Sequence, residues 1–172
     1  CLIQISSGDD NCHLVKFDVD FFQKKTPPKN LVKLLIVTEV SKIFHFARFD
    51  LAIIKKFLDV SCENIFCTKI ASKLVRTYTD KHGLKDLCKE LLGIDLNKSQ
   101  QSSDWSSESL SNNQISYAAS DVIYLNKLKE KLVEMLKREK RLDLANKIFT
   151  FLNTRVDLDI LGWDGQDIFS HS

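Results

Sequence analysis

Tyr117 and Asp121 stand four residues apart in the run YAASDVIYL. Four residues are slightly more than one helical turn, so a helix presents the phenol and the carboxylate on the same face. The residues around them are mostly apolar or small, which is typical of a buried helix. A carboxylate in such a place is a candidate ligand for a hard divalent cation, because these ions prefer oxygen donors.

Asp50 is a second candidate of the same kind. It lies in FHFARFDLAII, where a short β-prone run gives way to a helical pattern. Converging carboxylates can hold two metal ions about 4 Å apart, one activating water and the other stabilising the leaving oxygen in displacement at phosphorus. A tyrosine beside them can orient the water. A structural interpretation stays open, because a single Asp at a helix start is usually a cap and a Tyr at helical spacing usually packs in the core.

Strands are expected early in the chain and helices later. Two β-prone runs, 2–6 and 13–18, are separated by the turn-rich SGDDNC and predict a hairpin, and residues 42–46 predict another strand. Apolar periodicity predicts helices over 27–37, 48–58, 68–75, 83–93, about 114–141 and 142–163. The sequence therefore predicts an α/β fold, a mixed sheet flanked by helices with a helix-rich C-terminal half, in one domain of residues 1–172.

The composition is that of an ordinary globular protein. The formal net charge is only +2, so any basic surface for nucleic acid must be local. Five cysteines, an odd number with no C-x-x-C pair, favour reduced thiols over a disulfide framework or a zinc site. The apolar runs are too short to span a membrane, and no n-region and h-region pattern of a secretory signal appears in the sequence. These features favour a cytoplasmic protein without a membrane partner.

Taken together, the motifs resemble the tyrosine branch of the DEDD exonuclease superfamily, and ribonuclease D-like enzymes within it. YAASDVIYL resembles the third exonuclease motif, Y-x-x-x-D, and FHFARFDL resembles the second. GLKDLCKELLGIDLNK followed by SDWSSESLSNNQ matches those enzymes in order and spacing. Each motif alone is weak, but the ordered set covers nearly the whole chain. The resemblance implies a ribonuclease H-like fold and removal of nucleotides from 3′ ends with two Mg²⁺ or Mn²⁺ ions.

The resemblance also implies roles for individual residues. Asp50 and Asp121 would be metal ligands, and Tyr117 would hold the attacking water. His45 would contact the substrate. Lys98 would neutralise a phosphate, although a solvated loop lysine is an equally open interpretation. The implied partner is a nucleic acid with a free 3′ end. RNA is favoured over DNA through the family alone, and no residue pattern distinguishes the two or indicates an oligomeric state.

Three further residues carry weaker expectations. Trp105, in the SDW run, is expected to anchor its loop by packing. His82, in DKHGLK, has a counterpart in the family, but it is equally a residue at the start of a helix. Phe46 stands where the family often has Asn, which places a substrate contact there in question.

One part of the family pattern is absent. The family carries two of its four carboxylates as an Asp-x-Glu pair on a strand that precedes the one resembling CLIQIS, and the aspartates of FDVD at 17–20 come at the wrong point. Either that strand lies upstream of Cys1, or the chain is an inactive nucleic-acid-binding module. The first interpretation is favoured because the downstream pattern is kept. Since the absent strand belongs between 2–6 and 42–46, these two are predicted not to pair directly.

Overall fold

The computed structural model of the protein describes residues 2–9, 11–17, 27–96, 103–105, 107 and 109–171. Its elements are β1 (Leu2–Ile5), β2 (His13–Lys16), α2 (Lys29–Ile36), β3 (Lys42–Phe44), α3 (Ala47–Leu58), β4 (Ile65–Cys67), α4 (Thr68–Val75), α5 (Leu84–Leu87), η1 (Cys88–Leu92), α6 (Asn112–Ser120), α7 (Leu125–Arg138), α8 (Leu142–Leu158) and η2 (Asp159–Trp163). The segments η1 and η2 are π-helical turns that continue α5 and α8.

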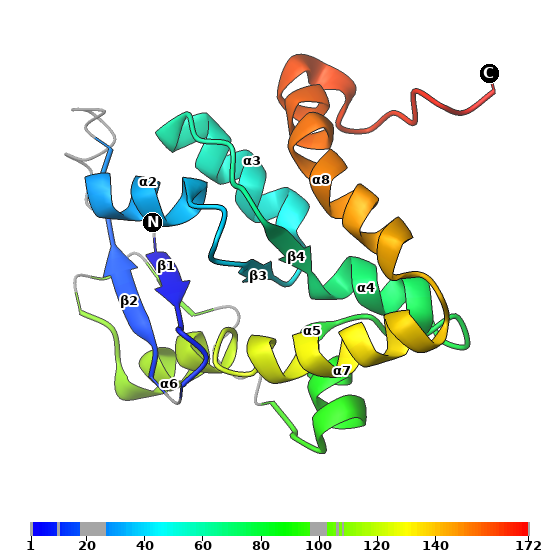
Figure 1. Ribbon diagram of the computed structural model, residues 1–172. Coiled ribbons are helices and arrows are strands. Elements are labelled where there is room, and N and C mark those ends of the chain that lie inside the picture. Colours follow the sequence, from blue (N-terminus) through cyan, green and yellow to red (C-terminus); the bar gives the residue numbers. More distant parts are fainter. Residues whose placement is uncertain are drawn as a thin grey trace.

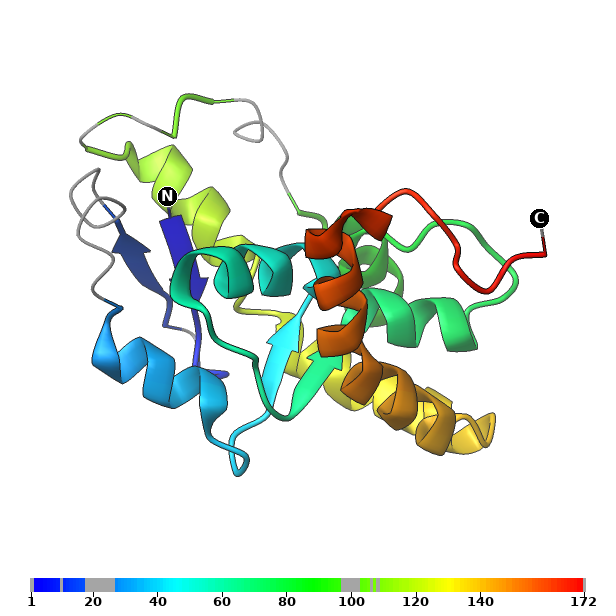
Figure 2. The same cartoon turned by 90° about the horizontal axis from the view of Figure 1, so that it is seen from above.

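The four strands form two separate sheets. β1 and β2 are the predicted hairpin, antiparallel with Leu2 opposite Lys16, whereas β3 and β4 are parallel with Lys42 opposite Ile65. The hairpin stands apart from β3–β4 in both ribbon views (Figures 1 and 2). The expected mixed sheet is thus divided into an antiparallel and a parallel part. The prediction that the strands at 2–6 and 42–46 do not pair directly is confirmed.

The main core surrounds β3–β4. α3 and α8 lie on one side of this sheet and α7 on the other (Figure 1). α7 contributes Leu128, Leu132 and Leu136, spaced at one helical turn and all without exposed surface. The ring centroids of Phe66 on β4 and Phe149 on α8 are 4.9 Å apart. These contacts bury all three residues of β4.

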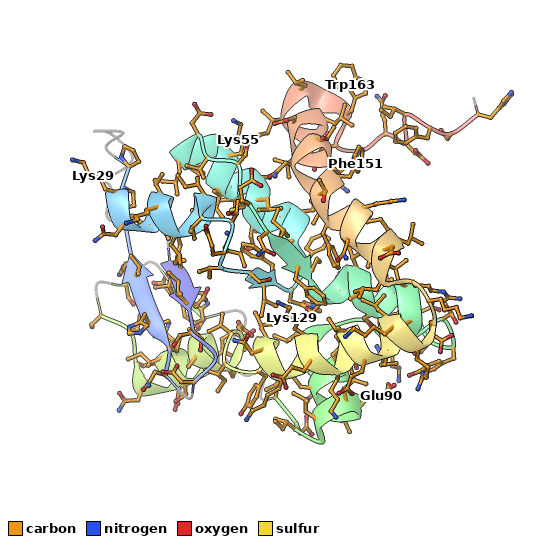
Figure 3. All side chains as sticks on the ribbon, viewed as in Figure 1. Lys29, Lys55, Glu90, Lys129, Phe151 and Trp163 are labelled. Atoms are coloured by element: carbon orange, nitrogen blue, oxygen red, sulfur yellow. The ribbon has the colours of Figure 1, made fainter. Side chains whose placement is uncertain are left out.

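Lys129 is a charged residue on the core side of α7. Its side chain points from the helix toward the sheet (Figure 3), and its ammonium lies 5.6 Å from the ring centroid of Phe66. Burial lowers the pKa of Lys129. The aliphatic stem therefore packs with the core, and the charge gains a favourable contact with an aromatic face.

The single helix expected over 114–141 is wrong. α6 ends at Ser120, residues 121–124 form turns, and α7 begins at Leu125. The hydroxyl of Ser120 donates to the carbonyl of Tyr117 at 2.7 Å, and the amide of Val122 donates to the carbonyl of Ala119, a tighter i→i+3 turn. Hydroxyl-to-carbonyl bonds of this kind compete with the helical ladder, which explains the break. Periodicity missed it because the apolar pattern continues through the turn.

β4 is the strand that sequence reasoning missed. It has only three residues, and α4 follows it at once. Three apolar residues give no periodicity that separates a strand from a helix. The helix expected over 83–93 is confirmed as α5 with η1, closed by Gly93 at φ +72°. In the part of the chain that the structure describes, none of the helices has the length and apolarity needed to cross a membrane.

Candidate active site

A cavity of about 500 Å³ lies between the two sheets. β1 forms one wall with Leu2, Ile3 and Gln4, and the end of β3 with Ile43 and Phe44 forms the opposite wall. α3 and the α6–α7 junction supply the remaining walls, with Phe49, Asp50, Ile53, Ile54, Phe57, Leu58, Asp121, Val122 and Leu125. Strand edges on two sides and helices on the others give this space the form of a slot for an extended segment.

Asp50 and Asp121 both line this cavity, although they are far apart in the sequence. Asp50 lies in the first turn of α3, and Asp121 directly follows α6 as its C-terminal cap residue. Burial raises the pKa of each carboxyl to about 6. In the described part of the chain neither has an ion pair with Lys or Arg. Two partly desolvated carboxylates without a cationic partner form a donor set that suits a hard divalent cation.

Tyr117 lies on α6 one turn before Asp121. Burial, and then the charge of Asp121, raise the pKa of its phenol, so the hydroxyl keeps its proton at neutral pH. The ring packs against Trp105, with centroids 5.9 Å apart and planes tilted by 48°. Gln114 fastens the same loop, because its side-chain amide donates to the carbonyl of Asp104 at 2.8 Å. Trp105, which packs on Tyr117, therefore follows a residue that Gln114 anchors.

His45 follows β3 directly and lines the cavity. Its Nδ1 lies 2.9 Å from the hydroxyl of Thr68, the first residue of α4. Burial, and then the charge of Lys69, lower the pKa of His45 to about 4, so the ring is neutral at physiological pH. The next residue, Phe46, is 46% exposed and has φ +71°, and the ammonium of Lys69 lies 4.3 Å from its ring centroid.

The structure thus brings together three of the residues that the sequence selected. Asp50, Asp121 and His45 line one cavity, with Tyr117 beside Asp121. Lys98 lies outside the described residues. Within the described ranges, no group of three or more His, Cys, Asp or Glu side chains is placed to hold a metal ion. Of the four carboxylates that the resemblance implies, the two expected in this chain, Asp50 and Asp121, line this cavity.

Sequence reasoning missed Thr68 and Ser72. Both are fully buried on α4, and each bonds to a histidine. Their i, i+4 spacing in TKIAS was the available signal, because it places two hydroxyls on the same helix face.

A family model for the 3′-5′ exonuclease domain matches residues 1–137. The chain belongs to the 3′-5′ exonuclease family. Among curated relatives, ribonuclease D of Gluconacetobacter diazotrophicus is 36% identical over 143 residues, which are 83% of this chain and 35% of that protein. This chain therefore spans about a third of the length of that exonuclease.

Solved structures agree with this assignment. NrnC of Brucella melitensis is 49% identical, with a TM-score of 0.93 over 100% of this chain and 82% of that one. Structures of NrnC include one with bound Mg²⁺ and one bound to pGG. Ribonuclease D of Escherichia coli, 24% identical with a TM-score of 0.76 over 90% of this chain and 40% of that one, shares the fold. The ribonuclease H-like exonuclease fold expected from the sequence is confirmed.

Proposed function

We propose that this protein is a metal-dependent 3′-5′ exonuclease that hydrolyses phosphodiester bonds at the 3′ ends of nucleic acids, with RNA preferred over DNA. The observation that carries the proposal is the placement of Asp50 and Asp121 on one cavity, both with a pKa raised by burial. Partly buried carboxylates with raised pKa values are common at functional sites, where a bound cation offsets their desolvation. The similarity to NrnC with bound Mg²⁺ supports the same assignment.

Asp50 and Asp121 would hold Mg²⁺ or Mn²⁺, two ions in the complete site. When bound, such ions supply an activated water and stabilise the leaving oxygen. The protein's own part is to fix positions. Tyr117, packed against Trp105, keeps its proton and directs its hydroxyl to the attacking water. His45 and Lys98 contact the substrate.

A strand that carries an Asp-x-Glu pair would complete the site from within the slot between β1 and β3. Side chains alternate across a strand, so the two carboxylates of Asp-x-Glu leave the same face. The facing strand edges supply backbone N–H and C=O groups for pairing on both sides. Apolar side chains of α3, among them Ile53 and Phe57, would cover the apolar residues of the strand.

NrnC bound to pGG suggests the kind of substrate. Its 49% identity extends over the whole of this chain. We expect this protein to act on short single strands, and pGG is a suitable test substrate. Single-stranded RNA and DNA of matched sequence would measure the preference for the 2′-hydroxyl.

The decisive experiment is shortening of 3′ ends in labelled single-stranded RNA and DNA by the full-length protein, with and without Mg²⁺ or Mn²⁺. Asp121→Asn is expected to lower cleavage by at least about 1,000-fold, because the amide loses the charge that holds the cation. Its circular dichroism and melting temperature should stay near those of the wild type. Asp157→Asn, at an exposed carboxylate of α8 outside the cavity, is the matched control and should remain active.

Tyr117→Phe separates the role of the hydroxyl from that of the ring. It keeps the packing on Trp105 and removes only a hydrogen-bonding group. Turnover should fall by about 10- to 100-fold, with metal affinity nearly unchanged.

Near-wild-type cleavage by Asp121→Asn would refute the assignment. Binding of nucleic acid without cleavage by the wild-type protein would favour the alternative, a non-catalytic nucleic-acid-binding module.

A further inference from the structure

Arg48 joins the start of α3 to the segment that follows α8. Its Nε donates to Oδ2 of Asp159 at 2.6 Å, and its Nη2 donates to Oδ1 of the same carboxylate at 2.8 Å. Nη2 also donates to the carbonyl of Asp164 at 2.7 Å. The side chain of Asp159 is only 11% exposed. Bidentate pairs between a guanidinium and a carboxylate are among the strongest and most directional polar contacts in proteins.

A second arginine binds the same two acceptors. Arg155 lies in the last turn of α8, and its Nη2 lies 3.0 Å from Oδ1 of Asp159. The same Nη2 donates to the carbonyl of Asp164 at 3.2 Å and to that of Trp163 at 3.0 Å. Two guanidinium groups thus converge on one carboxylate and one carbonyl. We call the side chains of Arg48, Arg155 and Asp159 the arginine clamp.

The first turn of α3 begins without the usual stabilisation of a helix start. Its N-cap residue, Phe46, has a left-handed backbone and makes no side-chain capping bond. A capping side chain normally satisfies free N–H groups of the first turn and fixes the direction in which the helix begins. α3 is instead fastened through its second residue, Arg48. The same turn carries Asp50.

Arg48 and Asp50 leave this turn in opposite directions. Residues two positions apart are separated by about 200° around a helix of 3.6 residues per turn. Arg48 therefore reaches outward to η2, which contacts α3 (Figure 2), whereas Asp50 lines the cavity. The turn cannot rotate without breaking the bidentate bond. The clamp on one side thereby fixes the direction of the carboxylate on the other.

We propose that the arginine clamp positions Asp50 for metal binding, with Arg48 as a positioning residue that acts through the first turn of α3. This inference rests on the proposed nuclease function. A metal ligand must be held within about 0.5 Å of its productive place, and a displacement of about 1 Å can cost about 100-fold in rate. Arg155 and Asp159 lie beyond residues 1–137, which the exonuclease family model matches. The C-terminal helix thus supports the site from outside the matched domain.

The first test measures Mn²⁺ binding to the full-length protein without substrate, by electron paramagnetic resonance of the free ion. Arg48→Met removes every bond of the clamp to α3 and should weaken Mn²⁺ binding by about tenfold, because Asp50 loses its fixed direction. Asp59→Asn is the matched control. It breaks the 2.9 Å ion pair with Lys55 at the other end of α3 and should leave Mn²⁺ affinity unchanged. Wild-type affinity in Arg48→Met would overturn the proposal.

The second test excludes a general folding defect. Arg48→Lys keeps the positive charge but cannot form a bidentate pair, so its melting temperature should stay near that of the wild type while Mn²⁺ binding weakens by about threefold. Asp159→Asn should weaken Mn²⁺ binding by a similar factor, and Asp157→Asn, two residues earlier, should not. The Arg48→Lys, Asp159→Asn double variant should bind no more weakly than the weaker single variant. Additive losses would show that the two residues act independently, contrary to the proposal.

Cleavage of labelled single-stranded RNA separates positioning from substrate binding. At saturating Mn²⁺, Arg48→Met should lower kcat by about tenfold and change KM by less than about twofold, because Arg48 is directed away from the cavity. A raised KM with unchanged kcat would assign Arg48 to substrate binding and contradict the positioning role. Failure of the wild type to bind Mn²⁺ or to cleave would refute the proposed function itself. Wild-type cleavage that is unaltered in Arg48→Met would refute only the role of the clamp.

Discussion

The two sheets of this protein differ in how completely they are buried. All three residues of β4 are buried, whereas all four residues of β1 are only half-buried. β3–β4 is enclosed by α3 and α8 on one side and α7 on the other (Figure 1). The β1–β2 hairpin turns one edge to the cavity. The difference shows that the candidate active site lies at a boundary between a tightly packed body and a partly covered hairpin.

The site residues are distributed unequally across this boundary. Asp50, His45 and Thr68 come from elements of the packed body, where rigid support fixes their side chains. The hairpin contributes apolar residues and one amide, Gln4, to the wall. Tyr117 and Asp121 come from α6 and its C-terminal end, and α6 packs against β2, so the candidate site residues come from both sides of this boundary.

The largest expected effect is the difference in stability loss between a core truncation in α7 and one in β1. Leu132→Ala, in the fully buried stripe of α7, should lower the free energy of unfolding by about 2–5 kcal/mol. Ile3→Ala, on half-buried β1, should cost about 1 kcal/mol in the 172-residue chain, because less apolar area leaves water there. Urea unfolding of both variants measures this. Equal losses would show that the hairpin is as well packed as the body.

The second expected effect is the pH dependence of stability that His45, on the packed body, produces. The pKa of His45 is about 4 in the folded protein against an ordinary value of 6.5, so between these values the unfolded chain binds the extra proton. Stability therefore falls as the pH falls from 7 to 5, by about 1–2 kcal/mol for this residue. The pKa values of Asp50 and Asp121 are raised to about 6, so these two carboxyls bind protons more readily in the folded protein. Their contribution to stability therefore increases as the pH falls.

The contribution of His45 is isolated by the difference between wild type and His45→Asn, because Asn does not titrate and the two aspartates are common to both. Thermal unfolding at pH 5, 6 and 7 should show the wild type losing stability relative to the variant. A difference that stays constant with pH would mean that His45 is not held neutral by burial.

The smallest expected effect is the difference in stability cost between alanine at Gly8 in the hairpin and alanine at Gly93 after η1. Gly8, in the hairpin turn, has φ +96°, and an added Cβ would lie 2.4 Å from Nδ2 of Asn126 at the start of α7. Gly93 has φ +72° with open space around it. Both Ala variants should lose about 1 kcal/mol from the left-handed backbone, and Gly8→Ala somewhat more, because Asn126 must move. Equal losses would show that Asn126 yields without cost and does not fasten the hairpin to α7.

Much of the fold could be predicted because its signals are local. The turn cluster SGDDN specified the hairpin, and Gly93 specified the end of a helix through its left-handed conformation. The order of the motifs around Asp50 and Asp121 specified the family. The end of α6 could not be predicted, because a single hydroxyl bond from Ser120 interrupts an apolar pattern that continues beyond it.

The sequence by itself determined which residues are candidates for chemistry and in what order they come, since motif spacing and periodicity are properties of neighbouring residues. Only the tertiary structure decided that Asp50, Asp121 and His45 line one cavity between two separate sheets. It also decided that Thr68 and Ser72 of α4 bond to His45 and His82. The reason is that such contacts join segments remote in the chain, and their geometry follows from the packing of all the helices around β3–β4 at once.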